Sequence, residues 1–223
     1  MRRGFVTTLV FGLIGLSILI SLGIWQMRRI PQKAAVIAQI EAMIHDAPVA
    51  LPEQPDPLRD AYLPVTVRGT FGDAELHVLV SSRDYGAGFR IIAPLTTDTG
   101  RTVMVDRGYV PTAAKSATRP KGTVEVIGNL QWPDERDRFI PEDDLEANYW
   151  YARDVVKMAE ALGTEPILIV ARETTGVGIL PMPASVASIP NNHFSYMVQW
   201  FLFAAVWFGM TSLLLWRMRT KRG

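Results

Sequence analysis

Two long apolar runs lie near the two ends of the chain, at residues 5–25 and 194–216, and neither contains a charged residue. At a helical rise of about 1.5 Å per residue, each run is long enough to cross a hydrocarbon layer of about 30 Å. The chain is 48% hydrophobic and 20% charged, which suits two spans but is too polar for a bundle of many spans. We therefore expect a hairpin of two transmembrane helices that flanks one domain outside the membrane.

The flanking charges indicate how this hairpin is oriented. The first run is longer than the apolar core of a signal peptide and no small-x-small cleavage site follows it, so we expect a retained anchor. Six basic residues lie between the two runs and the chain ends: Arg2, Arg3, Arg217, Arg219, Lys221 and Arg222. Three lie close to the runs on the side of the intervening loop: Arg28, Arg29 and Lys33. The positive-inside rule then predicts two cytoplasmic termini. The domain would be periplasmic in a Gram-negative bacterium, or in the intermembrane space of a mitochondrion.

Small residues recur on both runs and could let the two helices approach closely. They are Thr8, Gly12 and Gly15 on the first run, and Ala205, Gly209 and Ser212 on the second. The alternative, that these residues face lipid without a partner, stays open.

The middle of the chain has the pattern of one folded domain. Apolar residues at helical spacing predict a short helix that starts at Pro31 and ends near Pro48, and a proline-rich linker follows over residues 48–57. Alternating residues then predict six strands, at 65–71, 75–81, 89–95, 102–110, 123–130 and 166–171. A helix fits 155–162, with Asp154 as its cap and Gly163 as its stop. We expect a mostly antiparallel, barrel-like α+β domain at residues 31–190, between spans in residues 1–30 and 191–223.

Composition excludes several classes of site. Cysteine is absent, which excludes disulfides, thiolate zinc sites, covalent haem attachment and a cysteine nucleophile. The net charge of +1, without a basic stripe, argues against a nucleic-acid partner. No nucleophile elbow and no His-x-x-x-His metal pair occurs, and the Gly-x-Gly pairs lack the rest of a dinucleotide fingerprint.

His193 is the candidate ligand. It follows two asparagines, which can cap a helix, and opens the second apolar run at the depth of the lipid headgroups. A neutral imidazole there could bind a metal ion or a haem iron. The alternative is a polar interfacial residue that bonds only water or backbone. His45 and His77 lie on a predicted helix and a predicted strand, where surface roles are expected.

Arg107 is the candidate anion-binding residue. It lies in an apolar strand that is interrupted by Asp106, Arg107 and Gly108. The interruption predicts a bulge that turns Arg107 out of the sheet, where its guanidinium could clamp a carboxylate. The alternative is a salt bridge with a nearby acid such as Asp154.

These motifs together resemble the Surfeit-locus (Surf-one) family of cytochrome c oxidase assembly proteins. The resemblance covers nearly the whole chain and is carried by five blocks in order: Leu22-Gly23-Ile24-Trp25-Gln26, Gly69-Thr70-Phe71, Pro94-Leu95, the VDRGYVP segment at 105–111, and Asn191-Asn192-His193 with Tyr196 and Trp200. Two positions depart from the family pattern, Asp106 where Asn is frequent and Tyr109 where Trp is usual.

The resemblance implies a non-enzymatic biogenesis factor of the bacterial inner membrane, or of the mitochondrial one, that binds haem a. His193 would be the axial ligand of the haem iron. Trp25, Gln26, Tyr196 and Trp200 would offer flat surfaces and hydrogen bonds to the porphyrin, and Arg107 would pair with a propionate. The implied partners are membrane lipid, the catalytic subunit of a haem–copper oxidase and haem a synthase.

Two other functions stay open at this point. The chain could be a scaffold that holds oxidase subunits together without touching haem. It could also be an enzyme of haem modification, although a lone histidine without a second metal site argues against that.

Overall fold

The computed structural model describes residues 2–82, 85–119, 121–189 and 191–220. Contacts divide the chain into a helical unit, made by Met1–Gln39 with Val186–Gly223, and a domain, Ile40–Ser185. Of the basic residues used to predict orientation, Lys221 and Arg222 lie outside the described positions.

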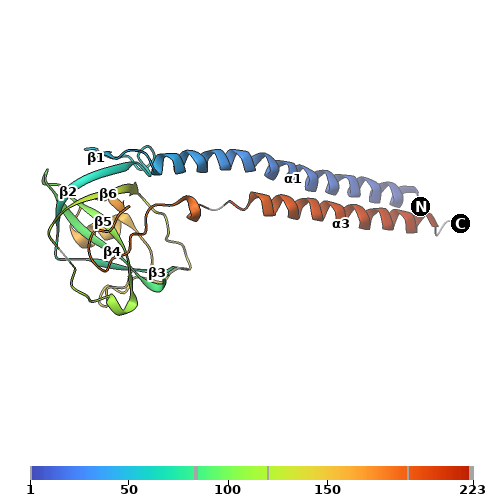
Figure 1. Ribbon diagram of the computed structural model, residues 1–223. Helices are drawn as coiled ribbons and strands as arrows, with labels where there is room; N and C mark the ends of the chain where they lie inside the picture. Colours follow the sequence, from blue (N-terminus) through green and yellow to red (C-terminus); the bar gives the residue numbers. More distant parts are fainter. Residues whose placement is uncertain (1, 83–84, 120, 190, 221–223) are drawn as a thin grey trace. The chain divides into compact units, whose positions relative to one another are not determined.

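The helical unit contains α1 (Arg2–Ile44) apart from its last five residues, which belong to the domain, and α3 (His193–Thr220), preceded by the 3₁₀ turn η2 (Val186–Ser188). Both helices are long and apolar enough to cross a membrane, judged by length and composition. They lie side by side and run in opposite directions (Figure 1). α1 continues without a break through Pro31, where the sequence predicts the start of a second helix. A proline removes one backbone donor and bends a helix, but it does not oblige the helix to end.

A regular seam joins α1 and α3. On each helix a row of partly or fully buried residues recurs at alternating spacings of three and four, the pattern of left-handed helix pairs: Thr8, Gly12, Gly15, Leu19, Leu22 and Gln26 on α1, and His193, Met197, Trp200, Ala204, Trp207 and Thr211 on α3. Buried Gly23 lies beside the row on α1.

Glycines set the approach of the two helices at this seam. A Cβ on Gly12 would collide with the Thr211 side chain, and one on Gly15 would lie 2.6 Å from the Trp207 ring. The Trp207 indole N–H also donates to the Gly12 carbonyl oxygen, at 2.9 Å. The predicted role of Gly12 and Gly15 is therefore confirmed.

The small residues predicted to face the partner on the second span do not do so. Ala205, Gly209 and Ser212 are exposed, while Ala204 and Thr211 face α1. One residue turns a helix by about 100°, so an error of a single position moves a side chain off the contact face.

Over its described residues the domain contains seven strands, and the six predicted ones are all present. They are β1 (Val49–Ala50), β2 (Pro64–Phe71), β3 (Leu76–Ser82), β4 (Gly86–Thr97), β5 (Thr102–Pro111), β6 (Thr123–Gln131) and β7 (Leu168–Ala171). The 3₁₀ turn η1 (Thr112–Ala114) follows β5, and α2 (Val155–Leu162) precedes β7. Asp154 caps α2 by accepting from the Lys157 N–H, and Gly163 ends it in the left-handed conformation, as predicted.

The strands β2-β6-β7-β5-β4 close into a five-stranded barrel through the pairing of β2 with β4. β1 extends β2, and β3 extends β4. All pairs are antiparallel except β1–β2 and β5–β7. Closure leaves the five barrel strands paired on both sides. In the described part of the chain β1 pairs with β2 alone, and the outer edge of β3 is bridged by Trp150 at Val78.

The core has two layers. Inside the barrel, buried side chains such as Val65, Leu95, Val105 and Ile169 form one cluster. Outside it, α2 packs Met158 against the opposite faces of β4, β5 and β7. Both faces of β5 and β7 are therefore covered, which explains why β7 is entirely apolar and why residues 103–110 of β5 are all buried.

Candidate functional site

His193 is the first residue of α3. The helix begins there because Tyr196 donates its backbone N–H to the Asn192 carbonyl oxygen, at 3.1 Å. The imidazole is partly buried and faces α1.

The His193 ring forms a hydrogen bond across the seam. Its Nδ1 lies 2.8 Å from Oε1 of Gln26, a hydrogen bond between the two helices. The Gln26 side chain is buried, with 8% of the residue exposed. Across the described part of the chain, the other ring nitrogen, Nε2, makes no hydrogen bond. Nε2 is thus the nitrogen available to a ligand.

The predicted aromatic residues lie around this pair on more exposed faces. Trp25 is 49% exposed, although it is the neighbour of buried Gln26, and Tyr196 is 47% exposed. Trp200 is partly buried and meets Phe203 edge-on, with ring centroids 6.1 Å apart. The structure therefore brings Gln26 to His193, keeps Tyr196 and Trp200 one and two turns further along α3, and leaves Trp25 on another face of α1.

These residues suit a haem better than a bare metal ion. Within the described ranges no cluster of three or more His, Cys, Asp or Glu side chains could enclose an ion. A haem iron already has four porphyrin nitrogens and needs only one or two axial bonds from the protein. A lone imidazole with an open Nε2, near exposed flat side chains, matches that requirement.

Arg107 belongs to the barrel domain. Asp106 pairs with Ile92 and Gly108 with Ile91, so Arg107 is the extra residue of a bulge, as predicted. The bulge does not turn Arg107 into solvent: only 2% of it is exposed. The guanidinium lies over the Phe71 ring, 4.1 Å from its centroid, and donates to Oγ1 and the carbonyl oxygen of Thr175, each at 3.0 Å.

The alternative salt bridge to Asp154 is wrong, because that carboxylate caps α2 and lies 3.9 Å from Arg136. Burial lowers the pKa of Arg107, and the charge of Arg119 lowers it further against the opposing effect of Glu75.

A small cavity of about 190 Å³ lies beside Arg107. Its charged lining comprises Arg107, Arg119 and Lys121 against Asp73 and Glu75, so cations exceed anions by one. Arg119 and Lys121 already form ion pairs, with Glu75 and Asp73 respectively. The cavity thus has the charge for a small anion, although its cations are engaged within the domain.

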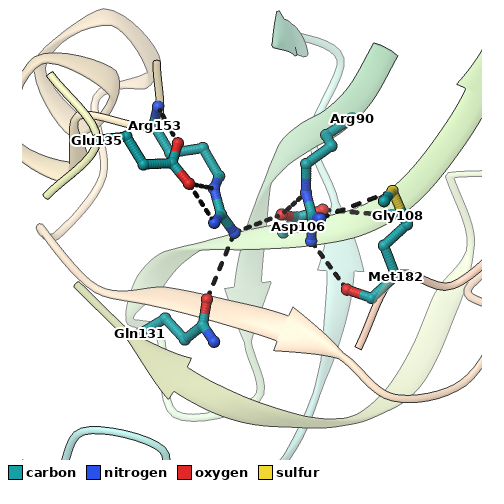
Figure 2. Close-up of polar contacts among 7 residues, drawn as sticks. All are labelled: Arg90, Asp106, Gly108, Gln131, Glu135, Arg153 and Met182. Atoms are coloured by element: carbon teal, nitrogen blue, oxygen red, sulfur yellow. Dashed lines mark hydrogen bonds and ion pairs between the residues drawn. The ribbon is translucent and has the colours of Figure 1, made fainter. Parts of the chain in front are cut away.

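A second charged cluster lies next to the bulge and was not predicted as a unit (Figure 2). Asp106 is fully buried. Its Oδ2 accepts a hydrogen bond from Nε of Arg90 at 2.6 Å and lies 3.6 Å from Nη1 of Arg153. Arg153 in turn donates from Nε to Glu135, at 3.0 Å.

The cluster balances two arginines against two carboxylates. Burial lowers the pKa of Arg153, but the hydrogen bond to Glu135 and the charge of Asp106 outweigh burial and raise it. Partial burial raises the pKa of Glu135, and its bonds to Arg153 reverse the shift, so this pKa is below its usual value. The cluster holds β4, β5 and the loops together rather than facing a ligand. The sequence signal that could have predicted this cluster is the presence of charged residues inside two otherwise apolar stretches, which include Arg90 on β4 and Asp106 on β5.

His77 corrects another prediction. It is buried, with 7% exposed, and its Nε2 lies 2.8 Å from Oε1 of Glu75, which also pairs with Arg119. β3 turns this side chain toward Phe89 rather than outward. His45 is exposed, as predicted.

Comparison with known proteins identifies the family. A model described as the SURF1 family matches residues 13–205. Surfeit locus protein 1 of Homo sapiens is 33% identical to the chain, over 84% of the chain and 72% of the human protein. Surfeit locus protein 1 of Gallus gallus is 35% identical over 81% of the chain and 66% of its own length. The SURF1-like protein of Monosiga brevicollis is 32% identical over 91% and 83%. The matched residues include both Gln26 and His193 as well as the bulge at Arg107, and the chain belongs to the SURF1 family.

Proposed function

We propose that this protein is a membrane-anchored assembly factor for a haem–copper oxidase, and that it binds haem a through His193 Nε2. The observation that carries the proposal is the hydrogen bond between His193 Nδ1 and Gln26. It orients the imidazole and leaves Nε2 available, which is the arrangement of axial histidines in haem proteins.

Family membership supports the oxidase role, since the five sequence blocks lie in the regions that the family match covers. Tyr196, Trp200 and Trp25 would contact the porphyrin, because their rings are fully or partly exposed near His193 or Gln26. Arg107 is retained as a candidate partner for a carboxylate such as a propionate, on the strength of the cavity beside it.

The proposed location is an energy-transducing inner membrane, with both termini cytoplasmic and the barrel domain on the opposite side. Two apolar helices and the excess of arginines at the outer ends support this orientation. A reporter fused at the C-terminus should be active only if it works in the cytoplasm. A fusion within residues 134–137 should show the reverse, and a periplasmic C-terminus would refute the hairpin.

Haem binding is tested by purifying the full chain after co-expression with the enzymes of haem a synthesis. The parent should purify coloured. His193→Ala should insert normally but bind haem more weakly with a shifted Soret band, because an iron–nitrogen bond is lost. His45→Ala is the matched control, since His45 is exposed and its side chain makes no hydrogen bond to any described residue. His77→Ala is a poor control because it would break the buried contact with Glu75.

A colourless parent that still supports assembly of the oxidase would favour the scaffold function instead. Binding to the catalytic subunit and to haem a synthase is tested in the same preparation by co-purification. The scaffold would retain the catalytic subunit with or without haem synthesis.

A further inference from the structure

Gln26 is a buried amide near the end of an apolar run. The preceding positions 5–25 carry no charge, and Gln26 turns inward while its neighbour Trp25 stays half exposed. Burying an amide without a hydrogen-bond partner is unfavourable, so the side chain requires a polar contact on the facing helix. Its hydrogen-bond partner is His193, at 2.8 Å. The two residues therefore fix each other's position.

The chemistry of this contact depends on which atom donates. A carboxamide oxygen can only accept, so contact through Oε1 requires the proton to be on Nδ1 of His193. The lone pair of the neutral ring is then on Nε2. A Gln26 turned by 180° would donate its NH₂ to Nδ1 and place the ring proton on Nε2, which could not bind a metal. The observed orientation is thus the one that prepares Nε2 as a ligand.

We propose that Gln26 is a positioning residue: it holds His193 in the Nδ1–H tautomer and aims Nε2 at an axial position of the haem iron. This role rests on the proposed function. Gln26 would contact Nδ1 of the His193 imidazole, on the side away from the iron, and would not contact the porphyrin. Acceptance of the Nδ1 proton also makes the imidazole a stronger donor, as the outer partners of metal-bound histidines do.

The tautomer can be measured without haem. The chain has three histidines, so the imidazole ¹⁵N resonances of the full-length protein in micelles are few and can be assigned with His45→Ala and His193→Ala. At mildly alkaline pH the His193 ring of the parent should show a protonated Nδ1 and a bare Nε2. Gln26→Leu should convert it to a mixture of tautomers. Gln32→Leu is the matched control, because Gln32 is on the same helix, is exposed, and accepts from Arg29 of its own helix rather than bonding to α3.

Haem binding provides the second readout. Loss of an outer-shell partner typically lowers metal affinity about 10–100-fold, so Gln26→Leu should raise the Kd for haem by that factor. Gln26→Glu keeps an acceptor for the Nδ1 proton and should preserve both the tautomer and binding. Its carboxylate should also lower the midpoint potential of the bound haem, because a more basic imidazole stabilises ferric iron. Rescue by Glu but not by Leu separates positioning from simple packing.

The outcomes separate this inference from the proposal beneath it. If His193→Ala binds haem as the parent does, His193 is not the ligand, and the role of Gln26 falls with it. If His193→Ala loses haem while Gln26→Leu changes neither the tautomer nor the Kd, only the role of Gln26 is overturned. A parent spectrum with the proton on Nε2 would also overturn it.

Discussion

Replacing Asp106 with alanine should destabilise the barrel domain severely. The carboxylate is fully buried and lies between Arg90, at 2.6 Å, and Arg153, at 3.6 Å. Removing it leaves two guanidinium groups with one remaining carboxylate, that of Glu135. Breaking a buried ion pair from one side costs about 3–5 kcal/mol, because the other charge stays desolvated and unpaired.

That loss is large compared with the stability of a typical domain, about 5–15 kcal/mol. For a domain of this size, it corresponds to a fall in Tm of about 10–15 °C. Asp106→Asn should cost less than Asp106→Ala, because its one amide oxygen can still accept from either the Gly108 N–H, which bonds Oδ1, or Arg90, which bonds Oδ2, although not from both.

Thermal unfolding of the full-length protein in micelles, followed by near-ultraviolet circular dichroism, measures this effect. The control is Asp98→Ala, which removes an exposed carboxylate 3.6 Å from Arg68 and should change the free energy of unfolding by less than about 1 kcal/mol. The double variant Arg90→Met with Asp106→Leu should recover most of the loss, because it removes both charges and fills their space. If Asp106→Ala costs no more than Asp98→Ala, the cluster does not hold the domain together.

Three further perturbations test other parts of the structure. Gly108→Ala should destabilise the domain by about 1–3 kcal/mol, since φ of Gly108 is +115° and a Cβ would collide with the Leu180 carbonyl oxygen. Chemical denaturation measures the change in the free energy of unfolding, and an unchanged midpoint would contradict the predicted backbone strain. Arg59 and the backbone N–H of Asp56 lower the pKa of the Asp60 carboxyl to about 2 from 3.8. The ionised carboxylate therefore stabilises the domain fully above pH 4, and this stabilisation is lost as the pH falls to 2. Asp60→Asn should remove this part of the pH dependence when unfolding is measured between pH 2 and pH 5. Gly15→Leu should push α1 and α3 apart at Trp207. Because the sequence has no cysteine, two introduced cysteines can carry spin labels that report the distance between the helices. An unchanged distance would contradict the close packing of Gly15 against Trp207.

The local elements of the domain were predictable from sequence. Alternation located six strands, and Asp154 and Gly163 marked the two ends of α2, because these signals depend on a few adjacent residues. The order of the strands was not predictable in the same way. β7 lies between β5 and β6 through pairings that join distant parts of the chain, and periodicity contains no information about them.

The candidate site shows the same division. The sequence placed Gln26 and His193 at one depth, because one ends a span and the other opens the next. It did not reveal that both side chains face the seam, which depends on the rotation of each helix about its own axis. The burial of Arg107 and His77 was not predicted for a related reason. In the sequence a buried polar side chain cannot be distinguished from an exposed one, because its hydrogen-bond partners come from distant parts of the chain.

The position of β7 has a consequence for the order of folding. Its four residues, all buried, fill the gap between β5 and β6 and are the last strand of the domain along the chain. Until residues 168–171 are available, β5 and β6 each retain an unpaired edge, and the apolar interior stays open to water. Such edges are prone to pair with other chains, and long-range closure is slow. A domain that is synthesised from its N-terminal side therefore keeps both of these edges open until its last strand is available.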